Sequence, residues 1–435
     1  MRLKSPSLHK PRLRVMLALG MAVVGFTGLA FAQATPALAD PTVTLVAPGS
    51  DTIQDVYNQF GNDVAGNLLG SYDAVNPVTQ AAHEIITPVD GTATAKCSFA
   101  RPNGSGEGVA DLRLAINPAT TNGTAAPLPS AQQGCVDIGR SSSGPGSLQS
   151  NTGPLVYVPF ALDGVAGATG PASCPGTTCA SYQYTYTGSD NAQHTVTATP
   201  TPTVLANVGM FTLHDLQTLY KNCTAVTANG VTYDPNTPNA AGTTKIDLYV
   251  PQSGSGTRNF WATTLGFSNT SLPACVHDTI VGGPLGTATP AVPVEEHNGT
   301  PEATDPNGFG PFSVAQWIAQ RNGHNDRRHT AVLQNLGPCT DITNPATCTA
   351  PVSPFSNGNP ATGALNTGFP ITRQVFSVVS FARVTNSADP LFSLLNNANP
   401  SGAGVCVDSL QILSYGFANI GTSCGAVLTA NRAQG

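Results

Sequence analysis

Charged residues are scarce in this chain of 435 residues. Asp, Glu, Lys and Arg together make up 10% of the sequence, compared with about 25% in an average soluble protein. Disorder driven by charge repulsion is therefore not expected. Apolar residues at 40% are enough for a folded core, and 45 Gly with 36 Pro, in no collagen-like period, indicate a fold rich in loops. The length suits two lobes or one elaborated domain.

Long apolar runs are also lacking, except near the N-terminus. Basic residues between Arg2 and Arg14 precede an apolar run at 15–32, and a small-residue pattern ends at Ala39. This arrangement predicts a secretory signal peptide at 1–39, with an uncleaved membrane anchor as the alternative. Cleavage would remove five of the 18 basic residues and none of the 24 acidic ones, leaving 13 against 24 and a net charge of −11. Such an acidic chain is not expected to bind nucleic acid.

Cysteine does not occur before Cys97, so no lipid-anchor cysteine is expected, and the secreted chain should be extracellular or associated with the cell surface. The ten cysteines include no C-x-x-C pair and no His at zinc-ligand spacing, so a metal site is not expected. An even number in an exported chain predicts disulfides. Their connectivity stays open, but close spacing suggests Cys174/Cys179, Cys339/Cys348 and Cys406/Cys424, which would leave Cys97 with Cys135 and Cys223 with Cys275.

Strand and helix patterns alternate along the chain, which predicts an α/β fold. The predicted strands lie at 43–46, 155–160, 245–250 and 374–384, and the predicted helices between Ile53 and Leu68, after Thr212, from Asn259 and at 312–321. Stretches rich in Thr, Pro, Gly and Asn separate these elements and are predicted to be surface loops, at about 117–134, 168–203, 225–243, 284–308 and 338–368.

Four short segments share one chemistry, at 49–52, 104–108, 139–143 and 253–257. Each offers hydroxyls and backbone N–H groups, and glycine lets the backbone come close to a ligand. At a helix N-terminus such groups hold an oxyanion without a lysine. Each segment taken singly has a simpler interpretation as a helix cap. The spacing of Asp51 and Gln54 matches a capping box.

The segment Asp247–Trp261 resembles the strand, Ser-Gly-Thr loop and helix of the phosphate-binding proteins that feed ABC transporters. Other segments are similar to that family in the same order. They are Gly49–Tyr57, Gly104–Gly106 and Asp137–Ser143 for three further ligand loops, Val156–Val165 for the crossover strand, Phe211–Tyr220 for the helix after it, and Gly368–Arg373 for the return into the first lobe.

The resemblance implies a two-lobed fold of the type II periplasmic-binding class, with each lobe a mixed sheet flanked by helices and with disulfide-stapled loop insertions. It implies a first lobe at 40–158 and 369–435, a second at 159–368, and a ligand in the cleft between them. The implied ligand-binding residues are Ser50, Asp51, Thr52, Ser105, Ser141, Ser142, Ser255, Gly256 and Thr257.

Two family charges are missing from this chain. The family has an Arg just before the Ser-Gly-Thr loop, where this chain has Pro251, and an Asp in the third loop, where it has Ser142. Arg140 is the candidate replacement guanidinium, and Asp51 is the candidate acceptor for a ligand proton. Without such replacement, the pocket would prefer another oxyanion, a phosphorylated or neutral polar solute, or no ligand.

The sequence thus predicts an exported, monomeric, non-enzymatic protein that captures phosphate or a related oxyanion without a cofactor, for uptake through an ABC-transporter permease. The alternative keeps the fold but uses the cleft for sequestration, sensing or cell-surface interaction.

A secreted serine hydrolase is the competing class, because Gly421–Gly425 matches the pattern G-x-S-x-G. That fold requires a catalytic His after the Ser, whereas His329 is the last His here, and Cys424 is expected in a disulfide. Two further groups match no metal-ligand spacing and are interpreted as solvated loop residues: His324 with Asp326 and His329, and Glu295-Glu296-His297.

Overall fold

Helices and strands alternate in the computed structural model, which describes residues 44–63, 68–79, 81–88, 97–117, 134–174, 179–236 and 242–435. The helices are α1 (Gln54–Asp63), α2 (Ser105–Ile116), α3 (Leu213–Asn222), α4 (Gly256–Leu265), α5 (Thr300–Thr304), α6 (Val314–Arg321), α7 (Phe381–Val384), α8 (Pro390–Leu395), α9 (Gly404–Val407) and α10 (Ser409–Ser414). The predicted α/β class is confirmed. The predicted signal peptide at 1–39 lies outside the described residues.

The strands are β1 (Leu45–Ala47), β2 (Leu69–Ser71), β3 (Ile85–Ile86), β4 (Phe99–Ala100), β5 (Ile138–Ser141), β6 (Leu155–Thr169), β7 (Tyr182–Thr187), β8 (Gln193–Ala198), β9 (Val226–Ala228), β10 (Val231–Asp234), β11 (Thr243–Lys245), β12 (Asp247–Tyr249), β13 (Val276–His277), β14 (Gly308–Ser313), β15 (Val332–Leu333), β16 (Thr372–Ser380) and β17 (Arg432–Ala433). All the described residues belong to one compact unit.

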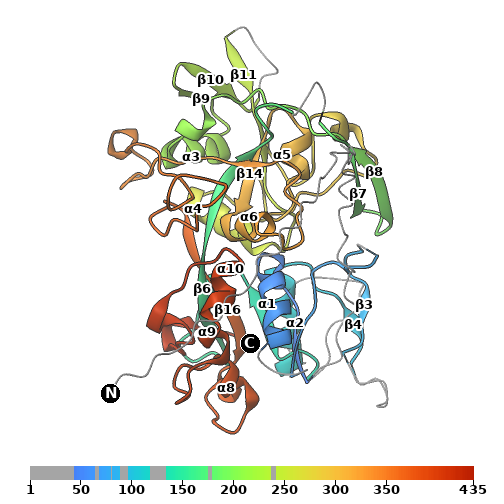
Figure 1. Ribbon diagram of the computed structural model, residues 1–435, viewed down its shortest axis with the longest axis vertical. Helices are drawn as coiled ribbons and strands as arrows, with labels where there is room; N and C mark the ends of the chain where they lie inside the picture. The colour runs from blue at the N-terminus through green and yellow to red at the C-terminus, as the bar shows by residue number, and fades with distance from the viewer. Residues whose placement is uncertain are drawn as a thin grey trace, which may run out of the picture. The chain divides into compact units, whose positions relative to one another are not determined.

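The largest sheet is built around β6, a strand of 15 residues (Figure 1). Its strand order is β13-β12-β14-β6-β16-β5, and β15 and β17 also pair with β6. The first part of β6 pairs antiparallel with β16 and β17, and its last part pairs antiparallel with β14 and β15. One continuous strand therefore joins two groups of elements.

The hydrophobic core is divided in the same way along β6. One cluster surrounds the end of β6 and includes Tyr220, Trp261 and Phe309. Another packs α1 and the C-terminal helices against the start of β6 and includes Phe60 and Phe160. The lobe boundaries at 158 and 368 stay a prediction.

Some element boundaries differ from the prediction. The strand predicted at 374–384 ends at Ser380, and the chain continues as α7. Helix α4 begins at Gly256 instead of Asn259, because Ser255 Oγ accepts a hydrogen bond from Arg258 N at 3.1 Å and caps the helix. Gly256 and Thr257 therefore lie in the first turn of a helix.

The prediction of a surface loop is wrong for part of 284–308. Val292 and Val294 are buried in a separate apolar cluster with Tyr184 and Tyr186 of β7, and residues 296–300 are buried as well. Composition did not reveal this, because two valines among many polar residues give no periodic signal.

All five disulfides suggested by spacing are confirmed: Cys97–Cys135, Cys174–Cys179, Cys223–Cys275, Cys339–Cys348 and Cys406–Cys424. Within the described residues, no helix has the length and apolar character needed to cross a bilayer.

Loop length should decide how much each disulfide stabilises the fold. Replacing Cys223 and Cys275 by Ala is expected to lower the free energy of unfolding by about 4 kcal/mol, because these residues are 52 positions apart. Replacing Cys174 and Cys179, which are 5 positions apart, should lower it by about 2 kcal/mol. Urea unfolding of both double variants beside the parent chain measures the difference, and equal losses would contradict the argument.

Candidate functional site

Three of the predicted loops meet where α2 and α4 begin. Ser105 Oγ lies 3.2 Å from Ser142 Oγ and accepts a hydrogen bond from Ser142 N at 3.0 Å. A Cβ on Gly256 would lie 2.4 Å from Ser105 Oγ and 2.5 Å from Ser142 Oγ. Only glycine at 256 therefore lets the start of α4 approach these two serines so closely.

A second set of contacts joins the first loop to α4 through a carboxylate. Thr52 Oγ1 donates to Glu296 Oε1 at 3.0 Å, and Ser255 Oγ donates to Glu296 Oε2 at 2.9 Å. Thr52 Oγ1 also lies 3.4 Å from Thr257 Oγ1. These four residues are buried, and Glu296 is 0% exposed. The loop hydroxyls thus surround a carboxylate that the protein itself supplies.

The positive charge at this place comes from Arg373 of β16. Arg373 pairs in register with Asp163 of β6, and its Nη2 lies 3.0 Å from Asp163 Oδ2. The same nitrogen donates to Thr257 Oγ1 at 2.6 Å and lies 3.5 Å from Thr52 Oγ1. Arg373 Nη1 is buried without a hydrogen-bond partner among the described residues. The guanidinium is therefore fixed by Asp163 and directed at the loop hydroxyls.

Glu296 lies among other titratable groups. Burial and the nearby Asp51 carboxylate raise the pKa of Glu296 to about 7. His297 Nδ1 lies 3.1 Å from Asp51 Oδ2, and His297 Nε2 lies 3.4 Å from Glu295 Oε2. Burial and Arg327 lower the pKa of His297, so its imidazole is neutral at pH 7. The charge on Glu296 therefore changes near neutral pH.

The remaining predicted residues serve the loops in other ways. Ser50 is buried, and its Oγ has no hydrogen-bond partner within the described part of the chain. Asp51 Oδ1 accepts from Thr52 N at 3.0 Å, and Gln54 Oε1 accepts from Ala74 N, so the predicted capping box does not form. Ser141 Oγ donates to the carbonyl of Ser143 within its own turn.

The structure directs the guanidinium of Arg140 at the backbone. It donates to Ser71 Oγ and to the carbonyls of Gly49 and Tyr72, the last at 2.7 Å. Burial lowers the pKa of Arg140 to about 10, so the side chain stays charged at neutral pH. Its described contacts hold the first loop in place and involve none of the hydroxyls of Thr52, Ser255 or Thr257.

Sequence reasoning missed Arg373, Glu296 and His297. Arg373 was part of the segment that resembles the family's return strand, but no local motif marks its role. Glu296 and His297 were interpreted as solvated, which is wrong, because they are 0% and 3% exposed. Their neighbour Asn298 is buried as well. The signal available in the sequence was this run of three adjacent polar residues in a Pro-rich stretch.

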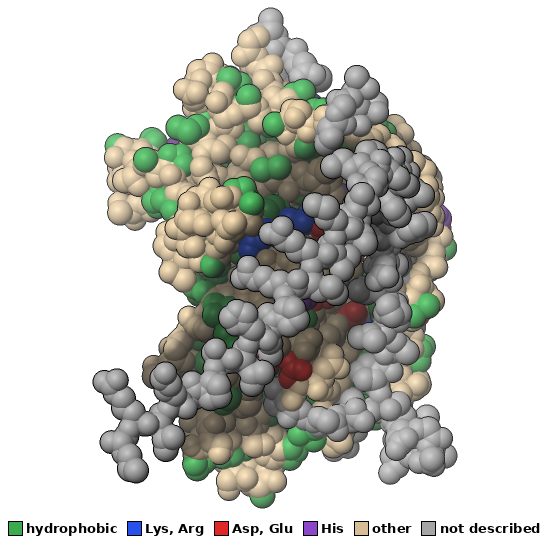
Figure 2. Space-filling view, viewed as in Figure 1, with side chains coloured by type: hydrophobic (Ala, Val, Ile, Leu, Met, Phe, Trp, Pro, Cys, Tyr) green, Lys and Arg blue, Asp and Glu red, His purple; other side chains and the backbone are tan. Residues whose placement is uncertain are grey.

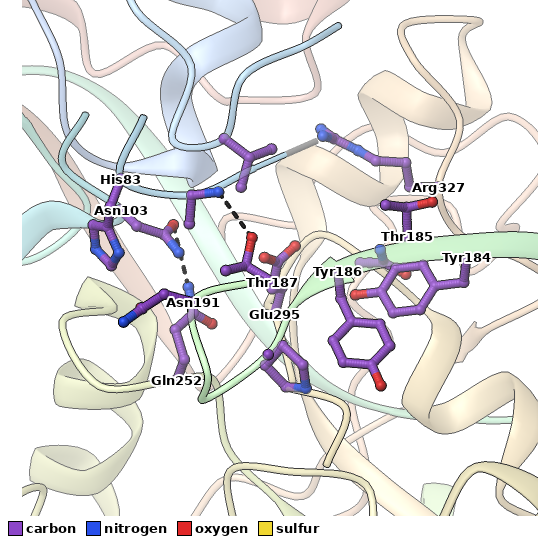
Figure 3. A pocket seen from close by; sticks show the side chains of 15 residues that line it. His83, Asn103, Tyr184, Thr185, Tyr186, Thr187, Asn191, Gln252, Glu295 and Arg327 are labelled. Carbon is purple, nitrogen blue, oxygen red and sulfur yellow. Dashed lines mark hydrogen bonds between the residues drawn. The ribbon is translucent and has the colours of Figure 1, made fainter. Parts of the chain in front are cut away.

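A cavity of about 170 Å³ lies beside the loops. Figure 3 shows Tyr184, Tyr186, Asn103 and Glu295 among the side chains that line it. Two lining residues from different segments are joined by a hydrogen bond of 3.0 Å from Ala82 N to Thr187 Oγ1 of β7. Because Asn103 and Glu295 are close in sequence to Ser105 and Glu296, this polar cavity borders the segments that carry the site.

The face in Figure 2 shows few charged side chains, and those visible gather mainly near its middle. Several of the chain's charges are buried, among them Arg140, Asp163, Glu296 and Arg373. Within the described residues, no group of three or more His, Cys, Asp or Glu side chains is placed to hold a metal ion.

The pattern Gly421–Gly425 does not form a nucleophile elbow. Residues Gly421–Ser423 form a short 3-10 turn, and Cys424 is bonded to Cys406. A hydrolase elbow instead joins a strand to a helix at the serine.

No protein-family model and no curated protein sequence matches the chain. A solved structure from Clostridium perfringens, described as a phosphate ABC transporter substrate-binding protein with bound phosphate, is 13% identical with a TM-score of 0.41 and covers 86% of this chain and 99% of that chain. One from Planctomyces limnophilus, described as a phosphate binding protein, is 11% identical with a TM-score of 0.37, over 88% and 95% of the chains. A high affinity periplasmic phosphate-binding protein bound with phosphate is 13% identical with a TM-score of 0.42, over 88% and 91%. Similarity this low does not assign a ligand to this chain.

The raised pKa of Glu296 should make stability depend on pH. Between pH 4.5 and 7 the folded chain keeps a proton on Glu296 that the unfolded chain releases, so the free energy of unfolding falls as pH rises through this range. Glu296→Gln removes this loss, and its stability relative to the parent chain should rise by up to about 3 kcal/mol between pH 5 and pH 8.

Urea unfolding of both proteins at the two pH values measures the effect, since the other carboxylates titrate in both and cancel in the difference. A stability difference that does not change with pH would show that Glu296 is not protonated in the folded chain near neutral pH.

Proposed function

We propose that this chain is an exported, non-enzymatic solute-binding protein that holds phosphate or a related small oxyanion at Thr52, Ser255 and Thr257. One observation supports this most strongly: the loop hydroxyls already hold an oxyanion, because both carboxylate oxygens of Glu296 accept hydrogen bonds from them. Hydroxyl and guanidinium groups that bind a carboxylate bind phosphate by the same chemistry.

Arg373 supplies the positive charge of the proposed site. Its Nη1 and the hydroxyl of Ser50 are buried donors without partners among the described residues, and buried polar groups are normally hydrogen-bonded. A ligand oxygen within reach of either would satisfy it. The first turn of α4 adds backbone N–H groups and the positive end of the helix dipole.

Arg373 also provides the guanidinium that this chain lacks just before the Ser-Gly-Thr loop. Pro251 occupies that position, and the nearest arginine in sequence, Arg258, is engaged with Asp278 Oδ2 at 2.8 Å and with the carbonyl of Pro251. A guanidinium from β16 therefore takes the place of one from the loop itself.

Binding is the event that the site's residues support, and delivery to an ABC-transporter permease is the use we propose for it. Five disulfides support export, since such bonds persist in oxidising compartments. Sequestration or sensing would begin with the same binding step.

Isothermal titration calorimetry with phosphate tests the proposal. The parent chain should bind at micromolar or tighter affinity at pH 6. The double variant Ser255→Ala, Thr257→Ala should bind more weakly by about 1–3 kcal/mol, because a buried ligand loses two hydroxyl partners and Arg373 loses its acceptor on Thr257.

The matched control removes the same two groups from exposed positions, as Thr263→Ala with Ser268→Ala, where Thr263 lies on the same helix. This control should bind like the parent chain. No heat with phosphate, sulfate, arsenate or phosphonates would contradict the proposal, and equal affinity in both double variants would remove Ser255 and Thr257 from the site.

A further inference from the structure

We propose that Glu296 competes with the ligand for the anion site: ionised, its carboxylate occupies the hydroxyls that a bound oxyanion would use, and protonated, it admits the oxyanion. This inference rests on the proposed function and names how that site is regulated. It makes ligand binding depend on pH.

The geometry of the carboxylate carries the inference. Its two oxygens accept from hydroxyls of two different loops, at 3.0 Å from Thr52 Oγ1 and 2.9 Å from Ser255 Oγ. Those two loops meet directly, since Thr52 Oγ1 and Thr257 Oγ1 are 3.4 Å apart although they are 205 positions apart in sequence. An ionised carboxylate only accepts hydrogen bonds, so it directs both hydroxyl protons toward itself and away from a ligand.

The surrounding charges oppose a second anion while Glu296 is ionised. The charged and titratable groups around it among the described residues are Asp51 from the first loop, Glu295 and His297 beside it in sequence, Arg373 from β16, and Asp55 and Arg327, which act on His297. Arg373 is already paired with Asp163. A ligand anion would therefore meet two nearby carboxylates, Asp51 and Glu296, against one guanidinium that is largely neutralised.

Protonation reverses this balance. Protonation of Glu296 removes one negative charge from the site. It also frees one of the two loop hydroxyls that donate to the carboxylate, and the new O–H group can donate to a ligand oxygen. The proton comes from solvent when a ligand binds to the ionised form, and it returns to solvent when the ligand leaves. The burial that raises the pKa of Glu296 to about 7 places this change near neutral pH.

The test compares phosphate affinity of the parent chain and Glu296→Gln by calorimetry at pH 6 and pH 8. Phosphate itself titrates in this range, but its protonation is the same in both titrations and cancels in the ratio of dissociation constants. The dissociation constant of the parent divided by that of the variant should rise roughly tenfold from pH 6 to pH 8. The reason is that the fraction of the parent with a protonated Glu296, the form that binds the ligand, falls by that factor. Binding by both proteins at pH 6 and by the variant alone at pH 8 also supports the inference.

Two further variants complete the design. Glu302→Gln removes another buried carboxyl, whose pKa burial raises to about 8 and whose described contacts include none of the loop hydroxyls; it should keep the pH dependence of the parent. Glu296→Ala serves as the second test of the same position if the Gln variant does not fold, with the same ratio expected.

The outcomes separate the inference from the proposed function. A ratio that stays constant between pH 6 and pH 8 while the parent binds phosphate overturns the inference and leaves the proposed function standing. No binding by any folded variant at either pH overturns the proposed function and the inference with it.

Discussion

The buried pair of Arg373 and Asp163 is the contact on which the arrangement of the site depends. Asp163 accepts hydrogen bonds from Ser313 Oγ and Ala315 N at the start of α6 and from the guanidinium of Arg373 across the β6–β16 pair. Loss of one partner of such a buried pair costs about 3–5 kcal/mol. One ion pair therefore contacts strands β6 and β16, the start of α6 and the hydroxyl of Thr257.

The scarcity of charge takes on a structural meaning in this arrangement. The chain uses few charged residues, and it buries several of them at the junction of the loops. At the proposed site, hydroxyls, backbone N–H groups and the N-terminus of α4 are the main donors, and Arg373 adds a guanidinium. The carboxylate of Glu296 gives that donor set an acceptor inside the protein, and it links the charge of the site to pH.

Patterns that are local in sequence were predicted well. Apolar patterns placed α1, α3, α4 and the first part of β6, because the spacing of side chains on one face depends only on the backbone geometry of each element. Cysteine spacing suggested all five disulfides. One error lies in the stretch at 284–308, where two valines pack against tyrosines of β7, and another at residues 381–384, where the strand pattern continues into a helix. The stretches at 168–203 and 225–243, predicted as loops, contain the strands β7 to β10.

The residue pattern alone was enough to predict which loops carry hydroxyls at helix starts. In the structure, the residues from these loops that lie close together are Thr52, Ser105, Ser142, Ser255, Gly256 and Thr257. Only the tertiary structure decided which charges join them. Arg140 lies in a predicted loop but donates to backbone carbonyls, whereas Arg373 and Glu296 come from distant segments. The direction of a buried charged side chain depends on strand register and on the partners that folding brings near it. Neither can be predicted from the residues next to it in the sequence.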